Sequence, residues 1–252
     1  MLRLTRLLPA LALFLLLGGC VPGVSPGTGA AEGVLVFPGG WIAGRWAHQG
    51  DYSFSLPAQP LDADAAGDVL GVLYPYSWQL YQDGQLKSEH TLPYPAKRLH
   101  ARPAWVAVLE RGLFTATDGW LDYPAADAAN TSSGLFWVND EGLWRGSKKV
   151  LAGEFERVLE LDGRVLALAA DRGVYWPDED EIDLPPSWTE ATAADDLYLL
   201  TPEGLYRYDP AGYELGFYPG SFNDLAAGPS GVWLAAADGR VIHLTPQLEE
   251  AW

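Results

Sequence analysis

The sequence predicts an all-β fold for residues 34–252, on three observations. Eleven Trp, twelve Tyr and eight Phe, together with 28 Gly and 19 Pro, favour strands joined by tight turns. Short β-prone runs alternate with polar turns along this part of the chain, and helical periodicity is almost absent from it. A tripeptide that recurs at a nearly regular spacing indicates that the fold is built from repeated units.

The repeated element is a β-hairpin whose second strand opens with Gly, an aliphatic residue and an aromatic residue. Strand, polar turn, Gly and strand form a hairpin signature, because glycine tolerates the positive φ that the turn requires. The four clearest copies are Gly112-Leu113-Phe114, Gly142-Leu143-Trp144, Gly173-Val174-Tyr175 and Gly204-Leu205-Tyr206. Weaker copies place further markers at residues 40, 77 and 239, so that seven units fill the body.

Many units add a further, exposed strand that ends in Pro. The examples are Gly216–Pro219, Glu181–Pro185 and Thr91–Pro93. Three or four short strands per unit, repeated around an axis, make a β-propeller, which hides nearly all of its strand edges. A β-solenoid is the competing architecture, although its coils are usually shorter and more regular. We therefore predict a β-propeller of seven short blades, with six or eight blades as alternatives.

Two segments near the C-terminus resemble a known repeat. Residues 203–210 read Glu-Gly-Leu-Tyr-Arg-Tyr-Asp-Pro, and residues 231–235 read Gly-Val-Trp-Leu-Ala. Together they resemble the two-component-regulator type of propeller repeat, and Gly134–Arg145 is similar but shorter. The resemblance covers about one and a half blades. It implies the propeller fold and says little about activity, because propellers host unrelated functions.

The N-terminus predicts export and attachment to a membrane. Arg3 and Arg6 precede an apolar run over residues 7–17, which is too short to span a bilayer and is typical of a signal peptide. Leu17-Gly18-Gly19-Cys20 matches the bacterial lipobox at all four positions. The resemblance to lipoproteins implies cleavage before Cys20 and acylation of its sulfur. Cys20 is the only cysteine of the chain, and acylation accounts for it.

These features divide the chain into three parts. We predict a signal peptide over residues 1–19, a lipidated tether over residues 20–33 and a propeller domain over residues 34–252. The tether is rich in Gly, Pro, Ser, Thr and Ala, and roughly a dozen such residues reach on the order of 20 Å as a random coil. The predicted location is the bacterial cell envelope, on its periplasmic or extracellular side, with a lipid anchor in the membrane.

The chain is strongly acidic, with a formal net charge of −17. Phosphate backbones would repel such a body, so we expect no nucleic-acid partner. The densest cluster is Asp178-Glu179-Asp180-Glu181, with Asp183 close behind. Asp178, Asp180 and Asp183 are weak candidates for a Ca²⁺ site, since Ca²⁺ takes oxygen ligands. A solvated acidic loop is the simpler interpretation, and the same holds for Asp62-Ala63-Asp64.

The sequence shows no recognisable catalytic set. Its four histidines fall in different units without metal-binding spacing, and we interpret them as loop or strand-face residues: His48, His90, His100 and His243. No Gly-x-Ser-x-Gly motif is present, and the anchor is the only thiol. We expect no cofactor and interpret the regularly placed Trp105, Trp137 and Trp233 as packing between blades.

Together these features predict a non-enzymatic envelope lipoprotein that binds envelope proteins and needs no obligate oligomer. One alternative is a ligand-binding or hydrolytic propeller that acts on glycan or another small molecule at the channel mouth. Convergent carboxylates, histidine or tryptophan in the channel would favour it, and a channel filled by Ala, Val and Leu would argue against it. A calcium-stabilised envelope component is the other alternative.

Overall fold

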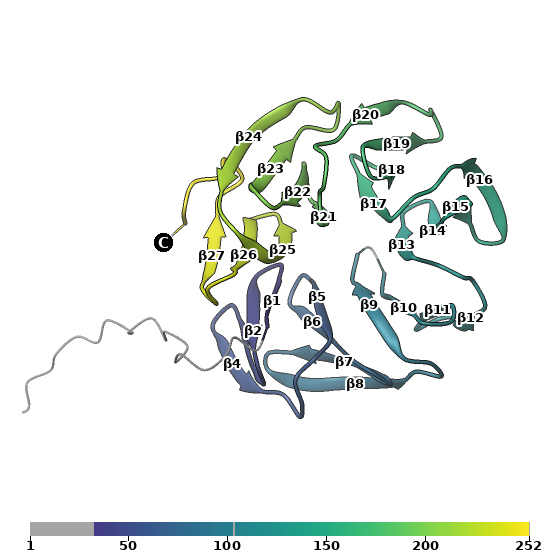
Figure 1. Ribbon diagram of the computed structural model, residues 1–252. Coiled ribbons are helices and arrows are strands. Elements are labelled where there is room, and N and C mark those ends of the chain that lie inside the picture. Colours follow the sequence, from purple (N-terminus) through teal and green to yellow (C-terminus); the bar gives the residue numbers. More distant parts are fainter. Residues whose placement is uncertain (1–32, 103, 252) are drawn as a thin grey trace, which may run out of the picture.

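Seven antiparallel sheets form a closed ring in the computed structural model of the chain (Figure 1). The structure describes residues 33–102 and 104–251. Consecutive segments of the chain build consecutive sheets, so each sheet is one blade and its first strand lies nearest the centre of the ring. The predicted seven-bladed β-propeller is confirmed.

Six blades have four strands each. Blade 1 contains β1 (Val34–Phe37), β2 (Gly40–Ala43), β3 (Trp46–Gln49) and β4 (Tyr52–Ser55), and blade 2 contains β5 (Asp62–Ala66), β6 (Val69–Tyr74), β7 (Ser77–Gln82) and β8 (Gln85–Thr91). Blade 3 contains β9 (Ala96–His100), β10 (Val106–Leu109), β11 (Leu113–Thr115) and β12 (Gly119–Leu121). Blade 4 contains β13 (Asp127–Thr131), β14 (Gly134–Asn139), β15 (Gly142–Arg145) and β16 (Lys148–Ala152).

The remaining three blades complete the ring. Blade 5 contains β17 (Arg157–Leu161), β18 (Arg164–Leu168), β19 (Arg172–Trp176) and β20 (Glu181–Asp183), and blade 6 contains β21 (Glu190–Ala193), β22 (Leu197–Thr201), β23 (Gly204–Tyr208) and β24 (Glu214–Pro219). Blade 7 has three strands, β25 (Phe222–Gly228), β26 (Gly231–Ala236) and β27 (Val241–Leu244). Beyond β27 a single bridge joins Leu244 to Glu250.

Glycine in the repeated tripeptide permits a close approach between the two outer strands of a blade. Gly142 begins β15 at φ 157°, and a Cβ there would collide with the carbonyl oxygen of Leu151 in β16. Gly204 begins β23 at φ 155°, where a Cβ would meet the carbonyl oxygen of Tyr218 in β24. The aliphatic residues that follow, Leu143 and Leu205, are fully buried. The tripeptide therefore marks the third strand in blades 3 to 6.

The first marker lies one strand earlier in its blade than the other six, although its predicted hairpin with Val34–Phe37 is confirmed. Gly40 begins β2, the second strand of blade 1, whereas the markers in blades 2 to 7 lie at or just before the third strand. The third strand of blade 1 begins at Trp46 instead. The shift in phase arises because Gly40 has the same tight environment as the other markers, with a Cβ position that would collide with the carbonyl oxygen of His48 in β3.

The core consists of seven apolar clusters, one for each interface between neighbouring blades. Phe37 and Ile42 of blade 1 pack against Leu70 and Val72 of blade 2 and are almost completely buried. Since no blade can bury its apolar face alone, the ring must close for the fold to be stable. The buried part of the last interface is small, with Val36 against Ala226 and Ala235.

The direction of the first strand defines the two faces of the ring. Residue 33 leads into β1 at one face, here called the proximal face. Because the strands of a blade alternate in direction, the turns between second and third strands and the connections between blades also lie on the proximal face. The turns between first and second and between third and fourth strands lie on the opposite, distal face.

Candidate functional site

Charged side chains line the central channel at one level. Each of blades 2 to 7 contributes one residue from its innermost strand, whereas blade 1 contributes only apolar residues from β1. These six residues, here called the channel ring, are Asp62, Arg98, Asp127, Arg157, Glu190 and Asp224. The channel is therefore not filled by Ala, Val and Leu.

Two arginines and one glutamate connect blades across the channel. Nη2 of Arg98 in blade 3 lies 3.4 Å from Oε2 of Glu190 in blade 6, and Nη2 of Arg157 in blade 5 lies 3.3 Å from the same oxygen. Nη1 of Arg98 lies 3.7 Å from Oδ1 of Asp127. Further toward the distal face, Nη2 of Arg102 donates a hydrogen bond to the carbonyl oxygen of Ala227 in blade 7. Two arginine side chains of blade 3 therefore contact blades on the opposite side of the channel.

Asp127 is the most deeply buried member of the channel ring, with no exposed side-chain surface. Burial would raise its pKa, but the His100 and Arg98 charges outweigh that effect and hold the pKa of Asp127 below its usual range. Nε2 of His100 lies 2.8 Å from Oδ1 of Asp127. Burial would lower the pKa of His100, and the Asp127 carboxylate raises it above the ordinary value. The pair is therefore an ionic contact inside the ring.

Asp62 and Asp224 flank blade 1 and have no arginine within ion-pair distance among the described residues. Burial raises the pKa of Asp62 to about 6 and that of Asp224 to about 7, although backbone amides donate to both carboxyl groups. The Asp62 and Glu190 charges raise the pKa of Asp224 further. This side of the channel has an excess of carboxylates.

Aspartates of the inner strands join three blades to the next blade around the ring. Oδ2 of Asp62 accepts a hydrogen bond from the amide of Leu99, and Oδ2 of Asp64 accepts one from Ala101, each at 2.7 Å. Asp127 accepts from the amide of Val158 in the same way, and Asp224 accepts from Val36 at 2.8 Å. The last contact joins blade 7 to blade 1. Asp62-Ala63-Asp64, interpreted from the sequence as solvated acids, therefore belongs to the inner strand β5.

The other three histidines lie on strand faces, one of the two placements that the sequence predicted, and each contacts a tryptophan. His48 stacks on Trp41 with ring centroids 3.9 Å apart, and His243 stacks on Trp233 at 4.3 Å. His90 lies 4.9 Å from Trp78 at a tilt. In each pair the two residues are direct cross-strand partners. The predicted packing role of the tryptophans is confirmed, since Trp105, Trp137 and Trp233 join clusters between blades.

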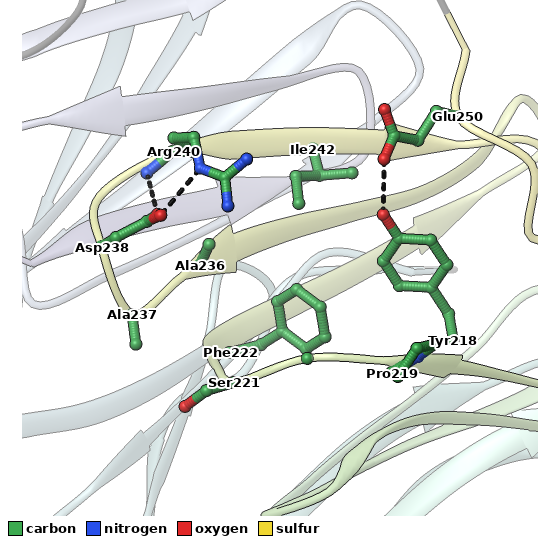
Figure 2. Close-up of a pocket in the computed structure, with 11 residues that line it drawn as sticks. Tyr218, Pro219, Ser221, Phe222, Ala236, Ala237, Asp238, Arg240, Ile242 and Glu250 are labelled. Carbon is green, nitrogen blue, oxygen red and sulfur yellow. Dashed lines mark hydrogen bonds and ion pairs between the residues drawn. The ribbon is translucent and has the colours of Figure 1, made fainter.

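A pocket of about 280 Å³ lies at the rim between blades 6 and 7 (Figure 2). Phe222 and Ile242 lie between two polar pairs, with Arg240 and Asp238 at one end and Tyr218 and Glu250 at the other. Nε of Arg240 is 2.8 Å from Oδ2 of Asp238, and the Tyr218 hydroxyl donates to Oε1 of Glu250 at 2.6 Å. The pocket borders β27, the outermost strand of the blade that has three strands.

Two of the three candidate calcium residues lie in a distal turn of blade 5, and the third lies at the proximal end of its last strand. Asp178 and Asp180 lie in the turn between β19 and β20, and Asp183 ends β20. Oδ2 of Asp180 is 3.7 Å from Nη1 of Arg164. Across residues 33–102 and 104–251, no group of three or more His, Cys, Asp or Glu side chains is placed to hold a metal ion.

The predicted lipidation site, Cys20, lies outside the described residues. So do the predicted signal peptide and nearly all of the tether. Within the part of the chain that the structure describes, no helix is long and apolar enough to cross a bilayer.

Sequence reasoning missed the channel ring, although a signal for it exists. In blades 2 to 7 the ring residue precedes the start of the second strand by seven or eight positions, as Asp62 precedes Val69 and Glu190 precedes Leu197. A charged residue recurring at this interval before each strong β-prone run marks the innermost strand.

No protein-family model and no curated protein matches the chain. Solved structures do match it in fold. BBS1N, solved in complex with ARL6DN, has a TM-score of 0.62 at 12% identity, over 84% of this chain and 89% of that chain. PorZ, a bacterial surface component of the type-IX secretion system of Porphyromonas gingivalis, has a TM-score of 0.60 at 11% identity, over 86% of this chain.

The extracellular domain of the putative one-component system BT4673 from B. thetaiotaomicron has a TM-score of 0.57 at 11% identity, over 84% of this chain. The matches cover 37% of the PorZ chain and 38% of the BT4673 chain. At such identities the likeness shows the fold alone. The chain is a seven-bladed β-propeller similar in fold to these proteins.

Proposed function

We propose that the protein is an exported lipoprotein whose propeller serves as a scaffold for protein–protein contact at the bacterial cell envelope. The observation that carries this proposal is that the charged groups of the channel ring are paired with groups of the protein itself. Arg98 and Arg157 are paired with Glu190, and four channel aspartates accept backbone amides of the next blade. The charged groups at the centre of the ring therefore hold the fold together.

The outer surface of the ring supports the same proposal. Tyr213, directly before β24, and Leu215 and Phe217 within it expose 72%, 49% and 40% of their surface. Large exposed aromatic side chains are enriched where proteins bind partners. BBS1N, a propeller of similar fold, was solved in complex with ARL6DN, which fits a scaffold role for this architecture.

The N-terminal sequence supports the location. A signal peptide, the lipobox Leu17-Gly18-Gly19-Cys20 and a Gly/Pro/Ser-rich tether stand directly before β1. Acylation of Cys20 would hold the propeller at a membrane of the envelope, because two or three acyl chains make a stable anchor.

Crosslinking in native membranes tests this proposal. We expect wild-type protein in the membrane fraction to recover the same envelope proteins in repeated pull-downs. The Cys20→Ser variant should leave the membrane fraction with an unchanged melting temperature, because the residue precedes the folded domain. Failure to recover any reproducible partner would argue against the scaffold, and retention of the variant in the membrane would argue against the anchor.

A second candidate function is supported by two buried donors in the channel. Nη1 of Arg98 and Nε of Arg157 have no hydrogen-bond partner among the described residues. A small ligand with carboxylate or hydroxyl oxygens, such as a sugar acid, could accept from both. Such a ligand should raise the melting temperature of the wild-type protein and leave that of an Arg98→Met variant unchanged. No shift across a panel of sugar acids and glycans would exclude this candidate for those compounds.

A further inference from the structure

The proximal face of blades 1 and 2 combines low charge with exposed apolar side chains. Four loops form this surface, over residues 44–45, 56–61, 75–76 and 92–95, and Arg45 is the only charged residue among them. Trp46, Leu61 and Tyr76 expose 58%, 47% and 59% of their surface. We call these three residues together with Arg45 the proximal patch.

Backbone hydrogen bonds hold the loops of the proximal patch in place. The amide of Leu56 donates to the carbonyl oxygen of Arg45 at 2.7 Å, and Nε of Arg45 donates to the carbonyl oxygen of Leu56 at 3.0 Å. The amide of Leu61 donates to Leu73, and the amide of Leu92 donates to the carbonyl oxygen of Tyr76, each at 2.8 Å. The exposed side chains therefore project from a fixed framework that spans both blades.

The distal face of the same two blades has the opposite character. Its turns, over residues 38–39, 50–51, 67–68 and 83–84, carry three charged residues, and all are acidic: Asp51, Asp68 and Asp83. The acidic turn over residues 177–180 lies on the distal face of blade 5. The ring is thus polarised along its axis in the sector where the chain enters it.

The chain enters blade 1 on the proximal face. Gly33 is exposed and leads directly into β1, and Cys20 lies roughly a dozen residues earlier, a reach on the order of 20 Å for a flexible segment. An anchor at Cys20 would therefore hold the proximal face of blade 1, rather than its acidic distal face, closest to the bilayer.

We propose that the proximal patch rests on the lipid surface, with Trp46, Leu61 and Tyr76 in the headgroup region and the acidic distal face turned away from the membrane. The inference depends on the anchor of the proposed function. Tyr and Trp favour the membrane interface because one end of each side chain is apolar and the other polar. Arg45 is attracted to anionic headgroups, which repel the acids of the distal face.

Thiol labelling of the lipidated protein in vesicles of phosphatidylethanolamine and phosphatidylglycerol tests this orientation. Gln59→Cys places a thiol in an exposed proximal loop beside the patch, and Ser147→Cys places one in an exposed distal turn. Acylated Cys20 does not react, so each variant has one free thiol. The reference for each is the same variant combined with Cys20→Ser, which has no anchor. We expect the rate of labelling by a bulky maleimide to fall at least ~5-fold for Gln59→Cys and less than ~2-fold for Ser147→Cys.

A double variant, Trp46→Ser with Tyr76→Ser, separates the patch from the anchor. This protein should still float with the vesicles, while the thiol at position 59 is labelled as fast as in the reference without the anchor. Equal labelling at positions 59 and 147 in floating protein would overturn the orientation alone. Protein that does not float with the vesicles would contradict the proposed anchor and, with it, the proposed orientation. Protection of position 59 in native membranes but not in vesicles would overturn the lipid assignment and identify a protein partner on this face.

Discussion

The guanidinium of Arg98 lies 3.4 Å from the carboxylate of Glu190, and the two residues belong to blades 3 and 6, which are separated by two other blades. This ion pair therefore crosses the channel. Arg157 shares the same Glu190 oxygen at 3.3 Å, and Arg98 also lies 3.7 Å from Asp127. Glu190 thus balances two cations that would otherwise repel each other within a partly buried space.

Replacing Glu190 by Gln should destabilise the fold. The variant leaves Arg98 and Arg157 facing each other without the shared carboxylate, and both are largely buried. We expect the free energy of unfolding in urea to fall by about 1–3 kcal/mol, less than for a fully buried pair. The matched control is Glu203→Gln in an exposed turn. This variant should change the free energy of unfolding by less than ~0.5 kcal/mol. Equal effects of the two variants would contradict a structural role for the bridge.

The free energy of unfolding should fall as the pH rises from about 4 to about 7. Asp62 and Asp224 have pKa values raised to about 6 and about 7, so the folded state binds their protons more tightly than the unfolded state in this range. The raised pKa of His100 acts in the same direction at higher pH. The lowered pKa of Asp127 acts oppositely, because its contribution is lost only as the pH falls through its folded value.

Unfolding in denaturant at a series of pH values measures how steeply the free energy of unfolding changes with pH. The double variant Asp62→Asn with Asp224→Asn cannot titrate at these positions, and its curve should be flatter between pH about 4 and about 7 whatever its absolute stability. An unchanged slope would show that these two carboxyl groups do not have raised pKa values in the folded protein.

Gly142→Ala should destabilise the protein more than Gly146→Ala, although both glycines lie in blade 4 and have positive φ. A Cβ at position 142 would collide with the carbonyl oxygen of Leu151, whereas a Cβ at position 146 meets no atom within 4 Å. We expect a loss of about 2–4 kcal/mol for Gly142→Ala, from steric overlap, and about 1 kcal/mol for Gly146→Ala, from backbone strain alone. Thermal unfolding measures both, and equal losses would contradict the close approach of β15 and β16.

EDTA should leave the melting temperature unchanged. Among the candidate calcium residues, Asp180 lies 3.7 Å from Arg164, and the neighbouring Glu181 lies 3.7 Å from Arg172. These cations reduce the negative charge that would attract Ca²⁺ to the turn. Calorimetry with and without EDTA checks the expectation. A lower melting temperature in EDTA that Asp178→Asn abolishes would instead assign calcium to Asp178, Asp180 and Asp183.

The fold could be predicted because its signals are local. Gly142 and Gly204 lie where outer strands approach closely, and the buried Leu143 and Leu205 follow them. About ten residues of sequence are therefore enough to predict each hairpin. A regular spacing of such hairpins is compatible with few architectures, and seven copies gave seven blades. The phase of the first marker differed, because Gly40 meets the same steric demand one strand earlier, and only Thr91 of the expected strand Thr91–Pro93 lies in a strand.

The channel ring was decided by the tertiary structure. Asp62 and Asp224 are far apart in the sequence, and their shared spacing before a second strand does not show what lies between them, yet both flank blade 1 because the ring closes. A charged residue at the start of an inner strand is compatible with either solvent or a channel until six such strands converge. The proximal patch depends on the fold in the same way. Trp46, Leu61 and Tyr76 share a face with Gly33 only because the strands of each blade alternate in direction.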